Sequence, residues 1–282
     1  GFLSVVGGLV TSDNASVATI AANCLCYVAD FNNYGTYEKS FSLAPETRVG
    51  LQATARLADR LQATAQITSR GVDPNPRLEW AYLSYAANPD WDVQVGRKRI
   101  PLYYYSSFQD VGMAYPWVGP PPELYGWEVT NYNGVSVRNR TSIGDAYVSS
   151  SFFAGSERVK DGRFMLAYSQ PHTDVAWNNL IGADIEVVRN NLTLRGVYLQ
   201  ADTSFADRDD PSLDWSERMQ AYSVAANLDF KDWFVLSEWT TNVRDNKAGS
   251  IAGVVITIPA VSLGVGYRWG AWTSFLNFSQ YS

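Results

Sequence analysis

The sequence has no run of about 18 apolar residues, which excludes a helical membrane span. It has one histidine, His172, and nothing in the sequence aligns this residue with a serine and an acid as a hydrolytic triad requires. No glycine-rich phosphate loop or metal signature occurs. We therefore expect no enzymatic activity, no cofactor and no metal site.

Cysteine is also scarce, because the chain has only Cys24 and Cys26, separated by one residue. A metal site needs more ligands than this pair, and no histidine lies nearby in the sequence. A disulfide between them can form in an oxidising compartment, although it would close a tight ring. We interpret the pair as incidental.

The chain has a low fraction of charged residues, and its net charge is negative. Charged residues make up 18% of the 282 residues, against about 25% in ordinary soluble domains. The net charge of −6 and the pI near 4.9 disfavour nucleic acid as a partner. Aromatic residues reach 14%, with ten Trp and seventeen Tyr, and these two residue types favour a membrane–water interface.

Two neighbouring stretches, Arg48–Leu57 and Arg60–Arg70, alternate between apolar and polar residues. A period of two indicates strands with one apolar and one polar face. The apolar face fits a tilted strand about ten residues long that crosses a bilayer. The polar face carries arginines that a soluble core does not accept unpaired. A lipid-facing barrel with a water-filled interior accounts for both faces.

The turn between these stretches predicts their register, because directly opposed residues point to the same face. A three-residue loop, Ala58–Arg60, satisfies this condition. It sets the pairs Leu57–Leu61, Ala55–Ala63, Ala53–Ala65, Thr54–Thr64 and Gln52–Gln66.

Thirteen strand candidates are joined by connections that alternate strictly between short and long, as in an outer-membrane barrel. The candidates are Phe2–Thr11, Thr47–Leu57, Leu61–Arg70, Glu79–Ala86, Asp92–Arg99, Gly134–Arg140, Ala146–Ala154, Leu180–Val188, Leu192–Ala201, Arg218–Phe230, Trp233–Val243, Val261–Trp269 and Trp272–Tyr281. Two of the long connections are 71–78 and 156–179, and Arg163–Ser169 in the second is a candidate for an extra short strand.

Thirteen is odd, whereas bacterial single-chain barrels have even strand numbers. We therefore expect C-terminal strands beyond this sequence. Three would give sixteen, although one or five would also restore an even number. The chain begins at Gly1 without a signal peptide, so we expect a mature exported product.

The connection Ile100–Trp127 combines many aromatic residues with five prolines, which stiffen the backbone. An aromatic loop of this kind would be costly in free water. We expect it to pack inside the barrel.

With the Arg48–Arg70 hairpin, the Glu79–Arg99 hairpin and the Tyr115–Gly126 segment, the chain resembles a Gram-negative outer-membrane porin. The resemblance is specific over residues 45–130. It implies one all-β domain over residues 1–282, a transmembrane antiparallel β-barrel of about sixteen strands. It also implies that the third long loop, residues 100–127, folds inward as a constriction. A homotrimer in the outer membrane, in contact with lipid and lipopolysaccharide, is part of the same expectation.

The resemblance further implies basic side chains on the barrel wall opposite acids on the inward loop, which together set up a transverse field. The wall candidates are Arg48, Arg56, Lys98, Arg138 and Arg140, with Arg195 in addition, and the loop candidates are Asp110 and Glu123. The alternative is that several of these arginines lie near a rim. Candidate aromatic contacts for sugar rings are Tyr103, Tyr104, Tyr105, Tyr115 and Trp117, and the alternative is that they pack the loop against the wall.

We therefore expect a porin that passes small hydrophilic solutes and ions by passive diffusion, with a weak preference for anions if the wall arginines dominate. The alternative function is that of a non-transporting carbohydrate-binding or adhesin-like β-protein at the cell surface.

Overall fold

The computed structural model describes residues 1–11, 26–168 and 172–281. Thirteen antiparallel strands form one sheet, in which β1 pairs with β4 and every later strand pairs with the next up to β15. The predicted count and order are confirmed for this sheet. The strands are β1 (Phe2–Ser4), β4 (Arg48–Ala58), β5 (Leu61–Arg70), β6 (Asp73–Ala86), β7 (Trp91–Arg99), β8 (Asn131–Ile143), β9 (Ala146–Val159), β10 (Thr173–Arg189), β11 (Leu192–Asp207), β12 (Trp215–Asp229), β13 (Trp233–Ala248), β14 (Val255–Trp269) and β15 (Trp272–Tyr281).

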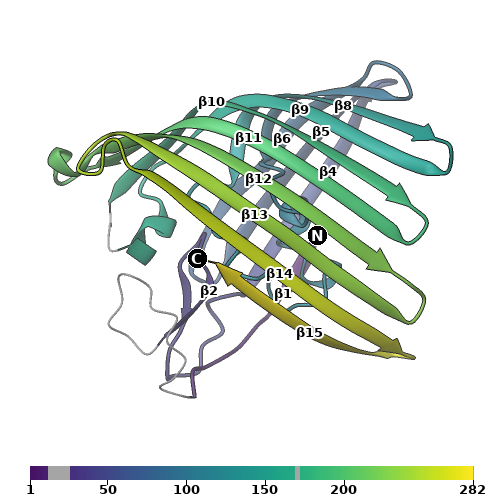
Figure 1. The fold of residues 1–282 in the computed structure, drawn as a ribbon, viewed down its shortest axis with the longest axis horizontal. Helices are drawn as coiled ribbons and strands as arrows, with labels where there is room; N and C mark the ends of the chain where they lie inside the picture. Colours follow the sequence, from purple (N-terminus) through teal and green to yellow (C-terminus); the bar gives the residue numbers. More distant parts are fainter. Residues whose placement is uncertain (12–25, 169–171, 282) are drawn as a thin grey trace.

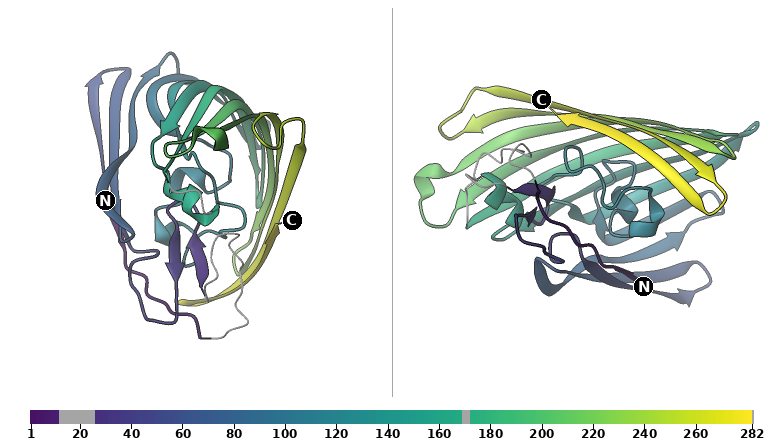
Figure 2. Two further views of the ribbon diagram at one scale, coloured as in Figure 1. Left: turned by 90° about the vertical axis from the view of Figure 1, so that its left-hand side faces the viewer. Right: turned by 90° about the horizontal axis from the view of Figure 1, so that it is seen from below.

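The sheet curls around several inward segments (Figure 1). The left view in Figure 2 shows the strands as an arc that encloses parts of the long connections and a small hairpin. This hairpin pairs β2 (Tyr27–Asp30) with β3 (Gly35–Tyr37). In the described part of the chain, no helix has the length and apolar character needed to cross a membrane.

The two faces of the sheet differ in the way that the alternation predicts. Both faces of β4 are exposed from Leu51 to Ala58, so neither face is covered by a second layer formed from the described residues. Leu51 is 63% exposed on the apolar face. The same face continues across the sheet with exposed Ile67, Leu83, Val95, Phe152, Ile181, Leu194, Val224, Leu263 and Leu276. An apolar surface of this extent is covered by lipid in a barrel that spans a membrane.

Exposed aromatic side chains gather where the strands meet the short connections. These are Tyr85, Trp91, Tyr147, Trp233, Tyr267, Trp269 and Trp272. Trp and Tyr have an apolar body and a polar tip, so a row at one end of the strands matches the aromatic girdle at a membrane interface.

The register of the first long hairpin is confirmed from Gln52–Gln66 through Ala55–Ala63. Its turn differs from the prediction, because Ala58 rather than Leu57 pairs with Leu61 and the register shifts between Arg56 and Ala58. A two-residue turn with a β-bulge therefore replaces the three-residue loop, and the bulge preserves the same-face pairing above it.

Other boundaries also differ from the prediction. The first strand ends at Ser4, and its continuation is reduced to a single bridge between Gly8 and Ser42. The connection predicted at 71–78 shrinks to two residues because β6 begins at Asp73. Residues Arg163–Tyr168 form the 3-10 helix η3 rather than a strand. The β2–β3 hairpin lies in a stretch for which no strand was predicted. Additional strands beyond these thirteen stay a prediction.

Candidate functional site

The segment between β7 and β8 folds into the interior of the curved sheet, and includes the 3-10 helices η1 (Ser106–Phe108) and η2 (Gly112–Ala114). This position agrees with the inward loop expected for residues 100–127. The segment is held by ionic contacts on one side and by aromatic packing on the other.

The ionic side is a buried cluster around Asp110. Its carboxylate accepts hydrogen bonds from Arg70 Nη2 at 2.9 and 3.0 Å and from Arg99 Nη2 at 2.7 Å. Arg48 Nη1 lies 3.9 Å from Asp110, and Arg48 Nη2 donates to the Tyr115 hydroxyl at 2.6 Å. The predicted wall residue Arg48 and the predicted loop residue Asp110 are thus brought together.

A second acid completes the cluster. Glu79, on β6, accepts hydrogen bonds from Arg70 and Arg99, each at 2.8 Å. Arg48 and Arg70 are directly opposed in the β4–β5 register, and opposed like charges destabilise a sheet. The two carboxylates offset that repulsion, and three guanidinium groups against two carboxylates leave one positive charge in excess.

The arginines also control the protonation of the loop acid. Burial by itself would raise the pKa of Asp110, but Arg70, Arg99 and Arg48 outweigh burial and hold this pKa well below its usual range. Asp110 is therefore a carboxylate at neutral pH, and it ties the loop to β5 and β7 through charge-assisted hydrogen bonds and to β4 through the longer ion pair with Arg48.

The aromatic residues of the loop pack against one another and against the wall. Tyr103 and Tyr125 have ring centroids 4.6 Å apart, and Tyr105 meets Trp117 edge-on at 5.0 Å. Tyr103, Tyr105 and Tyr115 are 7%, 7% and 8% exposed. Little of their surface is left for stacking on a solute, so the contacts favour the interpretation that they fix the loop to the wall.

The far side of the wall anchors the same loop. Glu238, on β13, accepts from the Tyr104 backbone N–H at 2.8 Å and from the Tyr125 hydroxyl at 2.7 Å. Arg195, on β11, donates to the carbonyls of Tyr103 and Pro101. Burial is the main reason that the pKa of Tyr125 lies well above its usual value, so this hydroxyl remains a donor to Glu238.

Three of the predicted wall residues form a row on β7 and β8. Lys98 Nζ donates to Ser136 Oγ at 2.7 Å, and Arg140 lies 2.9 Å from Asp92. Arg138 pairs in register with Asp92. All three side chains are half-buried. No contact between this row and Asp110 occurs in the described residues, so the row lies apart from the ionic cluster.

The two remaining predicted residues lie elsewhere. Arg56 is at the short-turn end of β4, where its side chain is 67% exposed and pairs with Asp59 at 3.4 Å. Its position matches the rim alternative. Glu123 accepts a hydrogen bond from Ser279 Oγ on β15 at 2.8 Å, so it joins the loop to the last strand instead of facing an arginine.

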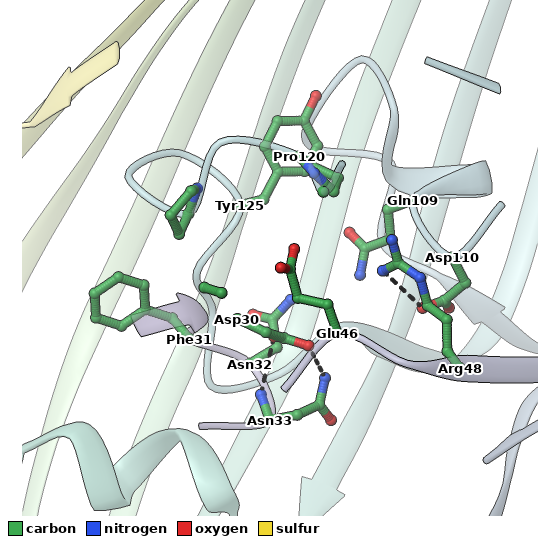
Figure 3. Close-up of a pocket in the computed structure, with 13 residues that line it drawn as sticks. Asp30, Phe31, Asn32, Asn33, Glu46, Arg48, Gln109, Asp110, Pro120 and Tyr125 are labelled. Carbon is green, nitrogen blue, oxygen red and sulfur yellow. Dashed lines mark hydrogen bonds and ion pairs between the residues drawn. The ribbon is translucent and has the colours of Figure 1, made fainter. Parts of the chain in front are cut away.

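The turn of the β2–β3 hairpin packs onto the loop and closes a small polar cavity of about 30 Å³ (Figure 3). Asp30, Glu46, Arg48, Gln109 and Asp110 line it. The Trp127 backbone N–H donates to Asn32 Oδ1 at 2.6 Å, which fastens the hairpin to the loop. The interior therefore holds this hairpin beside the loop, where only the loop was expected.

The prediction missed Arg70, Glu79 and Arg99. The predicted register already placed Arg70 opposite Arg48, and that pairing was a usable signal for a nearby acid. No such signal marked Arg99, because adjacent residues of a regular strand face opposite sides of the sheet. Regular alternation therefore predicts that Arg99 lies on the face opposite to Lys98. Gly96, with φ of +135°, interrupts the regular backbone of β7, and beyond it both Lys98 and Arg99 contact interior groups.

Cys26 is disulfide-bonded, so the interpretation of the cysteines as incidental is wrong for this residue. Cys24 lies outside the described residues. No group of three or more metal-ligating side chains suited to an ion occurs in residues 1–11, 26–168 and 172–281.

No protein-family model matches the chain, and no curated protein is similar to it in sequence. Among solved structures, an anion-selective porin from Comamonas acidovorans matches 84% of this chain and 69% of its own, with 16% identity and a TM-score of 0.53. The fold is that of an outer-membrane porin. Further matches are OmpT, an outer membrane protein of Vibrio cholerae (14% identity, 86% of this chain, 83% of its own, TM-score 0.46), and OmpF of Salmonella typhi (12%, 84%, 84%, 0.43).

Proposed function

We propose that this chain forms a porin-type channel in the outer membrane of a Gram-negative bacterium, and that small hydrophilic solutes and ions diffuse through it passively. The observation that carries the proposal is the pairing of an apolar exposed exterior with an interior loop fixed to the wall by Asp110 and Glu238. A loop held across the interior of a barrel narrows the path for solutes without blocking it.

The charge of the interior supports a weak preference for anions. The cluster around Asp110 leaves one positive charge in excess, and Lys98 and Arg138 add basic groups on the wall, where Arg140 is already paired with Asp92. We propose that these groups raise the local concentration of anions in the narrow part of the path.

The test is conductance across a planar lipid bilayer. Folded protein should give stepwise currents that are linear in voltage, and a salt gradient should give a reversal potential of the sign expected for anions. Heat-denatured protein is the control. Absence of current from folded full-length protein would reject the channel, whereas currents with a clear cation preference would reject only the selectivity.

We further propose that the chain assembles as a homotrimer that contacts outer-membrane lipid and lipopolysaccharide through its apolar exterior. The mass of the complex in detergent, after subtraction of bound detergent, should equal three chains. A mass of one chain in several detergents would contradict this assembly.

A further inference from the structure

A second cavity lies between the wall and the inward segments, where β5 to β9 meet the long connections. Its volume is about 80 Å³. Four arginines line it: Arg70, Arg77, Arg97 and Arg163. The acids in its lining are Glu79, Glu128 and Glu157.

All three acids already have cationic partners. Glu79 binds Arg70 and Arg99, Glu157 binds Arg97, and Glu128 binds Arg244 at 2.9 Å. Two of these partners, Arg99 and Arg244, come from outside the lining. Arg77 is paired with Asp73. Arg244 also binds Glu217, so Glu128 shares this cation, and none of the three acids is paired with Arg163 in the described residues.

Arg163 is the exception among the four arginines. It lies on η3, is half-buried, and donates from Nε to the Asn33 carbonyl at 2.8 Å. Its terminal amino groups have no hydrogen-bond or ion-pair partner in the part of the chain that the structure describes. A half-buried guanidinium without an anion is costly unless a ligand or water satisfies it.

Two side-chain amides in the same lining as Arg163 have donor groups without partners among the described residues. Asn32 uses its side-chain oxygen for the Trp127 N–H, which leaves its amide nitrogen as a donor. The Gln109 side chain lines the cavity and has no partner among the described residues. Among the described residues, the lining therefore offers one guanidinium without an anionic partner, together with spare amide donors.

We infer that this cavity binds a small hydroxycarboxylate, with Arg163 holding the carboxylate and the amides of Asn32 and Gln109 contacting its oxygen atoms. A carboxylate fits because a guanidinium can grip it with two parallel hydrogen bonds. The inference rests on the proposed function in one respect, namely that the bound carboxylate is a solute that passes through the channel.

The test uses purified protein in detergent, with lactate as the probe and lactamide as its uncharged counterpart. Calorimetry should show saturable binding of lactate and none of lactamide. The substitution Arg163→Gln should weaken lactate binding by about tenfold or more, because a charge-assisted pair is lost, and Arg163→Lys should retain part of it. Arg158→Gln is the matched control, since Arg158 is exposed on the adjacent strand end and does not line the cavity.

Equal binding of lactate and lactamide by the wild type would overturn the inference, even if the Arg163 variants failed to fold. Unchanged lactate affinity in folded Arg163→Gln protein would overturn it as well. A protein that conducts but does not bind lactate keeps the proposed function and loses this site. A protein that binds lactate through Arg163 but does not conduct keeps the site and loses the channel.

Discussion

At the scale of single residues, Asp110 is the main ionic contact of the inward loop, because its carboxylate lies against arginines from three strands. Replacing it with asparagine leaves three guanidinium groups with only Glu79 to neutralise them. Removing one partner of a buried ion pair costs about 3–5 kcal/mol, and we expect a loss in that range for Asp110→Asn. Urea unfolding in detergent micelles, followed by tryptophan fluorescence, measures it.

The matched control is Asp59→Asn, because Asp59 is fully exposed in its pair with Arg56. A solvent-exposed ion pair contributes little to stability, so this variant should unfold close to the wild type. Equal stabilities of the Asp110 and Asp59 variants would show that the buried cluster does not hold the loop.

The same carboxylate predicts a dependence on pH. Because the pKa of Asp110 is lower in the folded protein than in the unfolded chain, its stabilisation is complete above the unfolded pKa of about 3.9 and is lost as the pH falls toward the folded pKa. The stability difference between wild type and Asp110→Asn should stay constant from neutral pH to about pH 5 and shrink below pH 4. A difference that shrinks already near neutral pH would contradict the low pKa. Chemical unfolding at a series of pH values measures it.

At the scale of elements, β7 depends on Gly96. An added Cβ at this position would lie 2.2 Å from the Ala81 carbonyl oxygen, and the φ of +135° is one that side chains rarely adopt. We expect Gly96→Ala to destabilise the protein by about 2 kcal/mol or more, as measured by urea unfolding.

Gly196→Ala on β11 is the control for this substitution. There the nearest atom to an added Cβ is 3.9 Å away, so the change should be nearly neutral. If Gly96→Ala proved as mild as Gly196→Ala, the backbone of β7 would not need a glycine, and the account of why Arg99 turns inward would fail.

The inward loop is an element whose attachment can be tested by proteolysis. It holds several tyrosines and no lysine or arginine between Pro101 and Trp127. In Glu238→Ala the Tyr104 N–H and the Tyr125 hydroxyl lose their acceptor, and the loop should become open to chymotrypsin. Mass spectrometry of the fragments should then show cuts near Tyr103–Tyr105 that the wild type resists.

Asp245→Ala serves as the control, because Asp245 is an acid on the same strand, β13, and its ionic partner is Lys247 rather than a group of the loop. Cleavage of both variants at the same rate would mean that Glu238 is not an anchor.

At the scale of the whole molecule, thirteen alternating segments and the lengths of their connections predicted the sheet, and the alternation within Arg48–Arg70 predicted its two faces and the register of its first hairpin away from the turn. These follow from local rules, since the side-chain period and the same-face pairing are visible in the sequence. The inward position of residues 100–127 was also predictable, because exposing so many aromatic side chains to water is unfavourable.

The contents of the interior were less predictable. The β2–β3 hairpin rests on Asn32 and Asn33, whose partners lie about a hundred residues away at Trp127 and Arg163. Arg99, beyond the irregular backbone at Gly96, binds both Asp110 and Glu79, and Glu79 itself lies at a register shift between β5 and β6. Contacts of this kind depend on the curvature of the sheet and leave no periodic trace in the sequence.

The most direct test of the central claim places spin labels at successive positions of β4, in protein reconstituted into lipid with both native cysteines replaced by serine. A label at Ala53 should collide mainly with oxygen dissolved in the bilayer, and a label at Thr54 mainly with a water-soluble nickel chelate, with the alternation continuing from Leu51 to Arg56. Equal accessibility at Ala53 and Thr54, or protection of both from oxygen, would contradict a wall with lipid on one side and water on the other.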